Sequence, residues 1–161
     1  MKLPAKTALR DELATVIRAD LAVLERAHLA SREAATHEEA RPEDDKDTRA
    51  LEQSYLARGQ AMRVEELAAG LLAVSHMATR AFGATDFIAV GALVVAEEED
   101  VGRHVYFLAP YGGGTRLHGG KIQVVTPKSP LGLALVEKRA GDDCEVVLAG
   151  RTRELVVEDV K

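Results

Sequence analysis

Hydrophobic residues recur at three- and four-residue steps through the first half of the chain, a spacing that places them on one face of an α-helix. Ala, Leu, Glu and Arg, all strong helix formers, dominate this half, and Pro42 is the only proline between Thr7 and Arg80. One apolar stripe comprises Leu9, Leu13, Val16, Ile17, Leu21 and Leu24. A second comprises Leu51, Tyr55, Met62, Leu67, Leu71 and Val74. Two helices on either side of Pro42 are therefore predicted.

Each predicted helix would expose its apolar stripe to water if it stood alone. Pairing the two stripes in an antiparallel hairpin, in the manner of a coiled coil, removes both from solvent. We therefore expect residues 1–80 to form one helical hairpin domain, with the chain dividing near Gly83.

The second half of the chain changes to short β-branched and aromatic runs bounded by turn residues. Five strands are predicted, over residues 86–95, 104–108, 121–125, 144–148 and 153–157. Between the third and fourth, Ser129 and Pro130 have the positions of a helix cap and first helical residue, and the predicted helix runs to Lys138 before Gly141 ends it. Residues 84–161 therefore form an α+β domain of a curved, mostly antiparallel sheet and one helix.

The connection between the two predicted helices is acidic and lacks material for a core. No Leu, Ile, Val, Met, Phe, Tyr or Trp occurs between Ala30 and Ala50, and from His37 to Asp47 six carboxylates accompany two cations. Pro42 prevents an uninterrupted helix here. Because a helix of roughly 30 residues is about 45 Å long, the hairpin is expected to carry these acids to a tip in solvent, far from the second domain.

Composition narrows the class of protein. The 161 residues include 21 Lys and Arg against 26 Asp and Glu, a net charge of −5 that argues against free DNA binding. Cys144 is the only cysteine, so an internal disulfide is impossible and a reducing compartment is expected. No signal peptide is recognised, and the longest apolar stretches are too short to cross a membrane. We expect a cytoplasmic protein.

Two segments of the second half resemble a known family. Residues 124–142, which contain Ser129-Pro130-Leu131-Gly132 followed by Ala134-Leu135, Lys138 and Gly141-Asp142, resemble the "SPLGxALxxKxxGD" signature of the bacterial transcript cleavage factors, the Gre family. The final segment, Glu154 to Val160, is similar to that family's closing strand. Together with the helical first half, the resemblance covers essentially the whole chain in the family's order.

The resemblance to GreA and GreB implies a function in transcription elongation. In the family, an FKBP-like domain binds RNA polymerase at the rim of its secondary channel, and the coiled coil enters that channel. Acidic groups at the tip then help hold a Mg²⁺ ion in the polymerase active site against the 3′ end of a backtracked RNA. By this resemblance the chain is not an enzyme and has no cofactor of its own; it stimulates the RNA cleavage activity of the polymerase, with Mg²⁺ held jointly.

The resemblance also implies which residues act. The family's Glu-Asn pair aligns best with Glu43 and Asp44, which makes Glu43, Asp44, Asp45 and Asp47 the candidate carboxylates and Glu43 and Asp44 the candidate ligands of the shared Mg²⁺. Three residues before Glu43, where the family has Asp, stands Ala40, with Glu39 as the nearest substitute. Docking on the polymerase is expected to involve Ser129, Pro130 and Leu131.

Two alternatives accompany this prediction. Because the acid at position 40 is missing, the hairpin could occupy the secondary channel without stimulating cleavage and thereby inhibit or modulate transcription. Independently of any family, an acidic hairpin could be an adaptor that pairs with another helical protein. In that case the acidic residues between the two helices would form a solvated loop that keeps the protein soluble and has no binding role.

Overall fold

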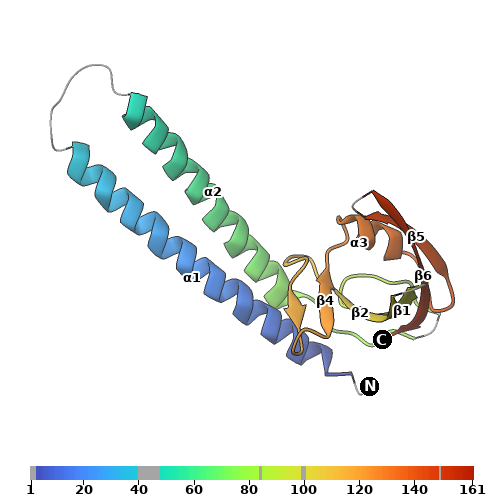
Figure 1. The fold of residues 1–161 in the computed structure, drawn as a ribbon. Helices are drawn as coiled ribbons and strands as arrows, with labels where there is room; N and C mark the ends of the chain where they lie inside the picture. Colours follow the sequence, from blue (N-terminus) through green and yellow to red (C-terminus); the bar gives the residue numbers. More distant parts are fainter. Residues whose placement is uncertain (1–2, 40–47, 84, 99–100, 149) are drawn as a thin grey trace. The chain divides into compact units, whose positions relative to one another are not determined.

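The computed structural model of the chain describes residues 3–39, 48–83, 85–98, 101–148 and 150–161. It confirms the predicted fold class, a helical hairpin followed by a mixed sheet with one helix (Figure 1). Helix α1 spans Lys6–Glu39 and helix α2 spans Thr48–His76. In this part of the chain, neither these helices nor any other has an apolar stretch sufficient for a membrane span.

Two compact units make up the chain. One comprises residues 15–71, the larger part of both long helices, and the other comprises residues 1–14 and 72–161. The ends of the two helices thus group with the sheet, whereas the pattern of the sequence suggested a division near Gly83. Here the first unit is called the hairpin unit and the second the sheet unit.

The sheet has six strands in the order β3-β4-β2-β1-β6-β5. The strands are β1 (Leu93–Glu98), β2 (Gly102–Leu108), β3 (Arg116–Leu117), β4 (Ile122–Val125), β5 (Asp143–Leu148) and β6 (Arg151–Val160). Neighbouring strands are antiparallel except β2 and β4, which are parallel. The predicted hairpins between the first two strands and the last two are confirmed. The short β3 was not expected from the sequence.

The first strand begins seven residues later than the sequence pattern suggested, at Leu93 and not at Asp86. Ile88 is buried, but its N–H donates to Lys138 and its carbonyl accepts from Glu137, so it pairs with the segment after α3. Gly91 then turns the chain with a φ of +91°, and a side chain there would overlap the carbonyl oxygen of Ala78. A run of β-branched residues indicates burial here without indicating which neighbour supplies the hydrogen bonds.

Helix α3 spans Pro130–Leu135 and is also shorter than predicted. Ser129 is its N-cap, as expected: the hydroxyl accepts from the Gly132 N–H at 3.1 Å and donates to the Thr126 carbonyl at 2.8 Å. The helix ends before Val136, and Glu137 follows with a positive φ of 65°. The hydrogen bond between Glu137 and Ile88 explains this early end, because the chain leaves the helix to pair with the segment before β1.

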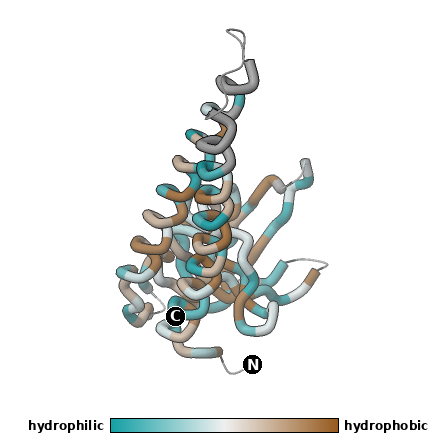
Figure 2. Tube along the Cα trace, turned by 90° about the vertical axis from the view of Figure 1, so that its left-hand side faces the viewer, coloured by the Kyte–Doolittle hydropathy of each residue, from teal (hydrophilic) through white to brown (hydrophobic). Residues whose placement is uncertain are grey.

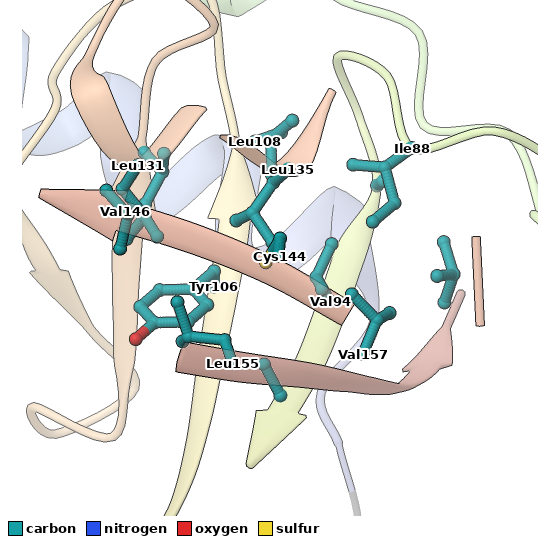
Figure 3. Close-up of a cluster of buried hydrophobic side chains, with 14 of the residues drawn as sticks. Ile88, Val94, Tyr106, Leu108, Leu131, Leu135, Cys144, Val146, Leu155 and Val157 are labelled. Atoms are coloured by element: carbon teal, nitrogen blue, oxygen red, sulfur yellow. The ribbon is translucent and has the colours of Figure 1, made fainter. Parts of the chain in front are cut away.

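The face of the sheet that α3 covers holds a cluster of buried apolar side chains (Figure 3). Leu131 and Leu135 of α3 belong to it together with Tyr106 and Val146 of the sheet. Intervening strand positions face the other way and are buried as well: Leu93, Val95, Val105, Phe107, Ile122 and Val124. The helix ends in this unit contribute the buried residues Leu9, Leu13 and Val74, and Met77, directly after α2, is buried as well. Buried apolar side chains therefore lie on both faces of the sheet.

Glu98 is the one buried charged side chain in the described ranges, with 5% of its surface exposed. One carboxylate oxygen lies 3.4 Å from the Arg153 guanidinium and the other 3.8 Å from Nε2 of His104. The His104 ring stacks on Tyr106 with 6.0 Å between centroids. Burial, reinforced by the charge of Glu98, raises the pKa of Tyr106 to about 12.

Gly132 places α3 against the segment before it. A Cβ on this residue would overlap the carbonyl oxygen of Thr126 and lie 2.8 Å from the Thr126 carbonyl carbon. Both are backbone atoms, which cannot rotate away. Gly132→Ala is therefore expected to lower the free energy of unfolding by about 1 to 3 kcal/mol in urea titrations followed by circular dichroism.

Gly59 supplies the matched control, because it lies on an exposed stretch of α2 where an added methyl group would have no contact within 4 Å beyond its own helix backbone. Gly59→Ala is expected to raise helix stability by about 0.5 to 1 kcal/mol, because alanine loses less backbone entropy than glycine in a helix. Equal effects of the two substitutions would contradict the close approach of α3.

The raised pKa of Tyr106 predicts a loss of stability at high pH. Between pH 10, where a tyrosine in the unfolded chain ionises, and about 12, the folded protein holds a proton that the unfolded chain has released. The free energy of unfolding should therefore fall as pH rises through this range. The difference between the parent protein and Tyr106→Phe isolates this contribution, and parallel pH profiles for the two proteins would exclude it.

Candidate functional site

The acidic connection between the long helices is the first candidate site. Helix α1 ends at Glu39 and α2 begins at Thr48, so the chain brings the acidic run to the point where the two helices are joined. Glu43, Asp44, Asp45 and Asp47 lie outside the described residues, as does the side chain of Glu39. Their role as tip carboxylates stays a prediction from the sequence.

The hairpin unit buries one stripe of each helix, but both stripes differ from the expected ones: Val16 of α1 is 37% exposed, and the stripe of α2 has other members. Within this unit, the buried or partly buried positions of α2 recur at steps of one or three residues: Ala57, Gln60, Ala61, Val64, Leu67, Gly70 and Leu71. Tyr55 and Met62 are 72% and 62% exposed, so their assignment to the apolar stripe was wrong. Their seven-residue spacing is compatible with either face of a helix, and the small residues that line the true interface gave a weak hydrophobic signal.

The packing of the hairpin unit becomes polar in the direction of the acidic connection. Ile17 of α1 and Leu67 of α2 are buried. Nearer in sequence to the acidic connection, interface positions hold His28 on α1 and Gln60 on α2, and both are partly buried. Nδ1 of His28 and Oε1 of Gln60 are buried without a hydrogen-bond partner among the described residues. Figure 2 shows that hydrophobic and hydrophilic positions alternate along both helices. Apolar burial therefore stabilises the hairpin mainly toward Ile17 and Leu67.

The first two turns of α1 are fixed within the sheet unit by polar contacts. Both carboxylate oxygens of Glu12 accept from the His118 N–H, at 3.0 and 3.2 Å. The Lys6 ammonium donates to the Arg80 carbonyl and lies 4.7 Å from the centre of the Phe82 ring, which Arg80 also covers at 3.8 Å. Burial and the neighbouring Arg80 lower the pKa of Lys6. The beginning of α1 is thus bound to the rest of the sheet unit at two points, through Lys6 and through Glu12.

Helix α3 and its cap form the second candidate site, and the structure separates the three residues expected there. Leu131 is buried in the sheet-unit core, and Ser129 is partly buried as the N-cap. Pro130 is exposed. Leu133, one helical turn from Pro130, is 70% exposed and was not singled out from the sequence. Pro130 and Leu133 therefore form the outward, apolar side of α3, and i, i+3 spacing from the proline was the signal that could have identified Leu133.

Metal-ligating side chains and the cysteine are the remaining groups relevant to chemistry. The described residues contain no group of three or more His, Cys, Asp or Glu side chains suited to a metal ion. Burial raises the pKa of the Cys144 thiol, which favours the neutral form over the nucleophilic thiolate and agrees with a packing role. The two candidate sites are the acidic connection, which lies outside the described residues, and the apolar outward side of α3.

Comparisons with known proteins give matches among solved structures only. No protein-family model matches the sequence, and no curated protein is significantly similar to it. GreA factor homolog 1 (Gfh1) of Thermus thermophilus is 17% identical, with 92% of this chain and 94% of that one covered and a TM-score of 0.40. Gfh1 of Thermus aquaticus is 20% identical over 91% and 92%, with a TM-score of 0.41. The elongation factor GreA/GreB from Nitrosomonas europaea is 18% identical over 61% and 78%, with a TM-score of 0.38.

These neighbours are transcription factors of the group that the signature at residues 124–142 resembles. Every identity is 20% or lower and every TM-score is below 0.5, so the similarities alone do not assign the chain to a family.

Proposed function

We propose that this chain is a Gre-type transcription factor that binds bacterial RNA polymerase and inserts its helical hairpin into the secondary channel. There it stimulates the polymerase to cleave backtracked RNA. The observation that carries the proposal is the combination, in one chain, of the signature around α3 with a preceding helical hairpin whose connection is rich in carboxylates. Neither feature alone specifies a partner.

The dimensions of the helices suit delivery of a group over a distance. At 1.5 Å per residue, the 34 residues of α1 extend about 51 Å and the 29 residues of α2 about 44 Å. Paired helices resist bending more than a single segment or a loop would. A hairpin of this length can therefore carry its connecting segment into a channel of another protein.

The chemistry proposed for the connecting segment requires only carboxylates. Mg²⁺ prefers hard oxygen ligands and retains several waters, so one or two carboxylates added to an existing site can orient the ion and an attacking water. Glu43 and Asp44 are proposed as these groups, supported by Asp45, Asp47 and Glu39. The polymerase supplies the remaining ligands and performs the hydrolysis, so this chain is a cofactor of another enzyme.

Ala40 favours a second candidate function. The family's first tip acid is replaced by a methyl group at this position, which cannot bind a cation. A hairpin with an incomplete set of acids would enter the channel and obstruct it without activating a water. Such a protein would slow nucleotide addition and would compete with cleavage-stimulating factors.

Docking is proposed to use the outward side of α3. Exposed apolar side chains beside a rigid helix cap suit an interface, because their burial is favourable and the cap holds the helix in position before binding. Pro130 and Leu133 supply these side chains, and Ser129 holds the start of the helix through its two hydrogen bonds.

Binding to polymerase provides the first test. Leu133→Ser should weaken binding of the full chain to purified bacterial RNA polymerase about tenfold in fluorescence anisotropy, since one large apolar side chain leaves the interface. Val147→Ser is the matched control, because Val147 is 60% exposed and its neighbour Val146 packs in the cluster with α3, so Val147 lies on the opposite side of β5. No binding of the parent protein would favour the adaptor hypothesis, and equal effects of the two variants would exclude the α3 surface.

Cleavage of stalled elongation complexes provides the second test. With Mg²⁺, the parent protein should release short 3′ RNA fragments, and Glu43→Ala or Asp44→Ala should reduce the rate on the order of 100-fold, a magnitude suited to loss of a metal ligand. Glu65→Ala, an exposed acid on α2, should leave cleavage unchanged.

Ala40→Asp distinguishes the two candidate functions. If the parent stimulates cleavage, added Asp should increase the rate further or leave it unchanged. If the parent binds polymerase, slows nucleotide addition and releases no fragments, the non-cleaving function is correct, and cleavage gained by Ala40→Asp would identify the missing acid as the cause.

A further inference from the structure

An exposed apolar stripe runs along α2 inside the hairpin unit. Tyr55 and Met62 are 72% and 62% exposed, and Ala69, which is also exposed, follows at the same seven-residue spacing. Seven residues make almost two turns of helix, so these three side chains lie on one side of α2. Leu67 is buried and lies five residues from Met62, which places it on the far side of the helix. The stripe is therefore separate from the packing between α1 and α2.

Two opposite charges follow one flank of this stripe. Arg58 and Glu65 each come three residues after a member of the stripe and are seven residues apart, so both lie on the same flank. Both residues are exposed, and neither has an ion-pair partner among the residues that the structure describes. Along α2, this flank is thus positive first and negative seven residues later.

This order of charges determines how a second copy of α2 would pair with the first. In a parallel pair each residue lies beside its own counterpart, so Arg58 would face Arg58 and Glu65 would face Glu65. In an antiparallel pair with its two-fold axis at Met62, Arg58 of each copy lies beside Glu65 of the other, which gives two ion pairs. Tyr55 then lies opposite Ala69, a large side chain against a small one. Charge and size therefore both favour the antiparallel pair.

The other charges near the stripe do not oppose this arrangement. Glu52 and Glu66 follow the opposite flank, seven residues on either side of Gly59. The antiparallel pair places Glu66 beside Gly59 of the second copy and Glu52 opposite the uncharged residues 71–74, so like charges do not meet. Arg63 comes one residue after Met62, about 100° round the helix, and lies outside the contact.

We propose that the outward side of α2 pairs with the same surface of a second copy of this chain in an antiparallel arrangement. Met62 packs against Met62 at the centre, and Arg58 and Glu65 form ion pairs between the copies. One large apolar side chain per seven residues makes a narrow contact, so association requires concentrated protein, and dilute assays such as RNA cleavage are unaffected. The surface includes no residue of the acidic connection or of α3, so the inference does not rest on the proposed function.

Sedimentation velocity of the full chain over a wide range of protein concentration tests the self-association. We expect the sedimentation coefficient to rise with concentration and to fit a monomer–dimer equilibrium. Met62→Ser should weaken dimerisation at least about tenfold, because each copy loses an apolar side chain from the contact. Leu29→Ser is the matched control, since Leu29 is 56% exposed on α1, and it should leave the equilibrium unchanged.

Charge reversal tests the ion pairs. Arg58→Glu alone or Glu65→Arg alone should weaken dimerisation about tenfold, since the two copies then repel each other at two positions. An equimolar mixture of these two single variants should recover the dimer, because each copy then carries the charge that the other requires. Arg18→Glu, which makes the same change of charge at an exposed position of α1, is the control and should have no effect.

Disulfide trapping tests the orientation. Met62→Cys should cross-link two copies under mild oxidation, because the two-fold axis places these positions face to face. Tyr55→Cys should not, since the antiparallel pair separates its two copies by about 21 Å along the helix. Cys144 is buried, so the parent protein should give no cross-link.

Four results would each overturn the proposal. They are a parent protein that stays monomeric at every concentration, equal effects of Met62→Ser and Leu29→Ser, no recovery of the dimer in the mixture of charge variants, and cross-linking through Tyr55→Cys as readily as through Met62→Cys.

Discussion

The pairing of two long helices through narrow apolar stripes is the constraint on which the rest of this molecule depends. Each helix buries only a few large side chains, such as Ile17 on α1 and Leu67 on α2, and neither would be stable alone in water. Near His28 and Gln60 the interface becomes polar, so apolar burial contributes little there. The hairpin is therefore held together most strongly near Ile17 and Leu67.

Backbone hydrogen bonds outside the paired strands determine where α3 ends and where β1 begins. Ile88 pairs with Glu137 and Lys138, which ends α3 early and delays the start of β1. Gly132 lets α3 approach Thr126 at backbone contact, and Ser129 caps the helix. These interactions fix α3 on one face of the sheet, so its outward side, Pro130 and Leu133, is a rigid surface. A surface that is already ordered loses little entropy on binding, which suits the docking role proposed for it.

The two proposals concern different parts of the molecule and different chemistry. Delivery of carboxylates requires a long hairpin, acidic residues at the helix connection and a partner that supplies the metal ion.

Sequence alone was sufficient for the fold class, because hydrophobic period reports directly on helix or strand. It identified both long helices, the two β-hairpins and the cap at Ser129, and it identified the acidic residues from Glu39 to Asp47, whose function is still a prediction. It misplaced Tyr55 and Met62, because a seven-residue spacing cannot distinguish the faces of a helix whose interface contains Gln60 and alanines. Tertiary structure alone decided that Leu131 is buried and Leu133 exposed, and that Glu98 is buried beside His104 and Arg153. These features depend on which strands are neighbours, and strand order arises from contacts between residues far apart in the chain that no local pattern encodes.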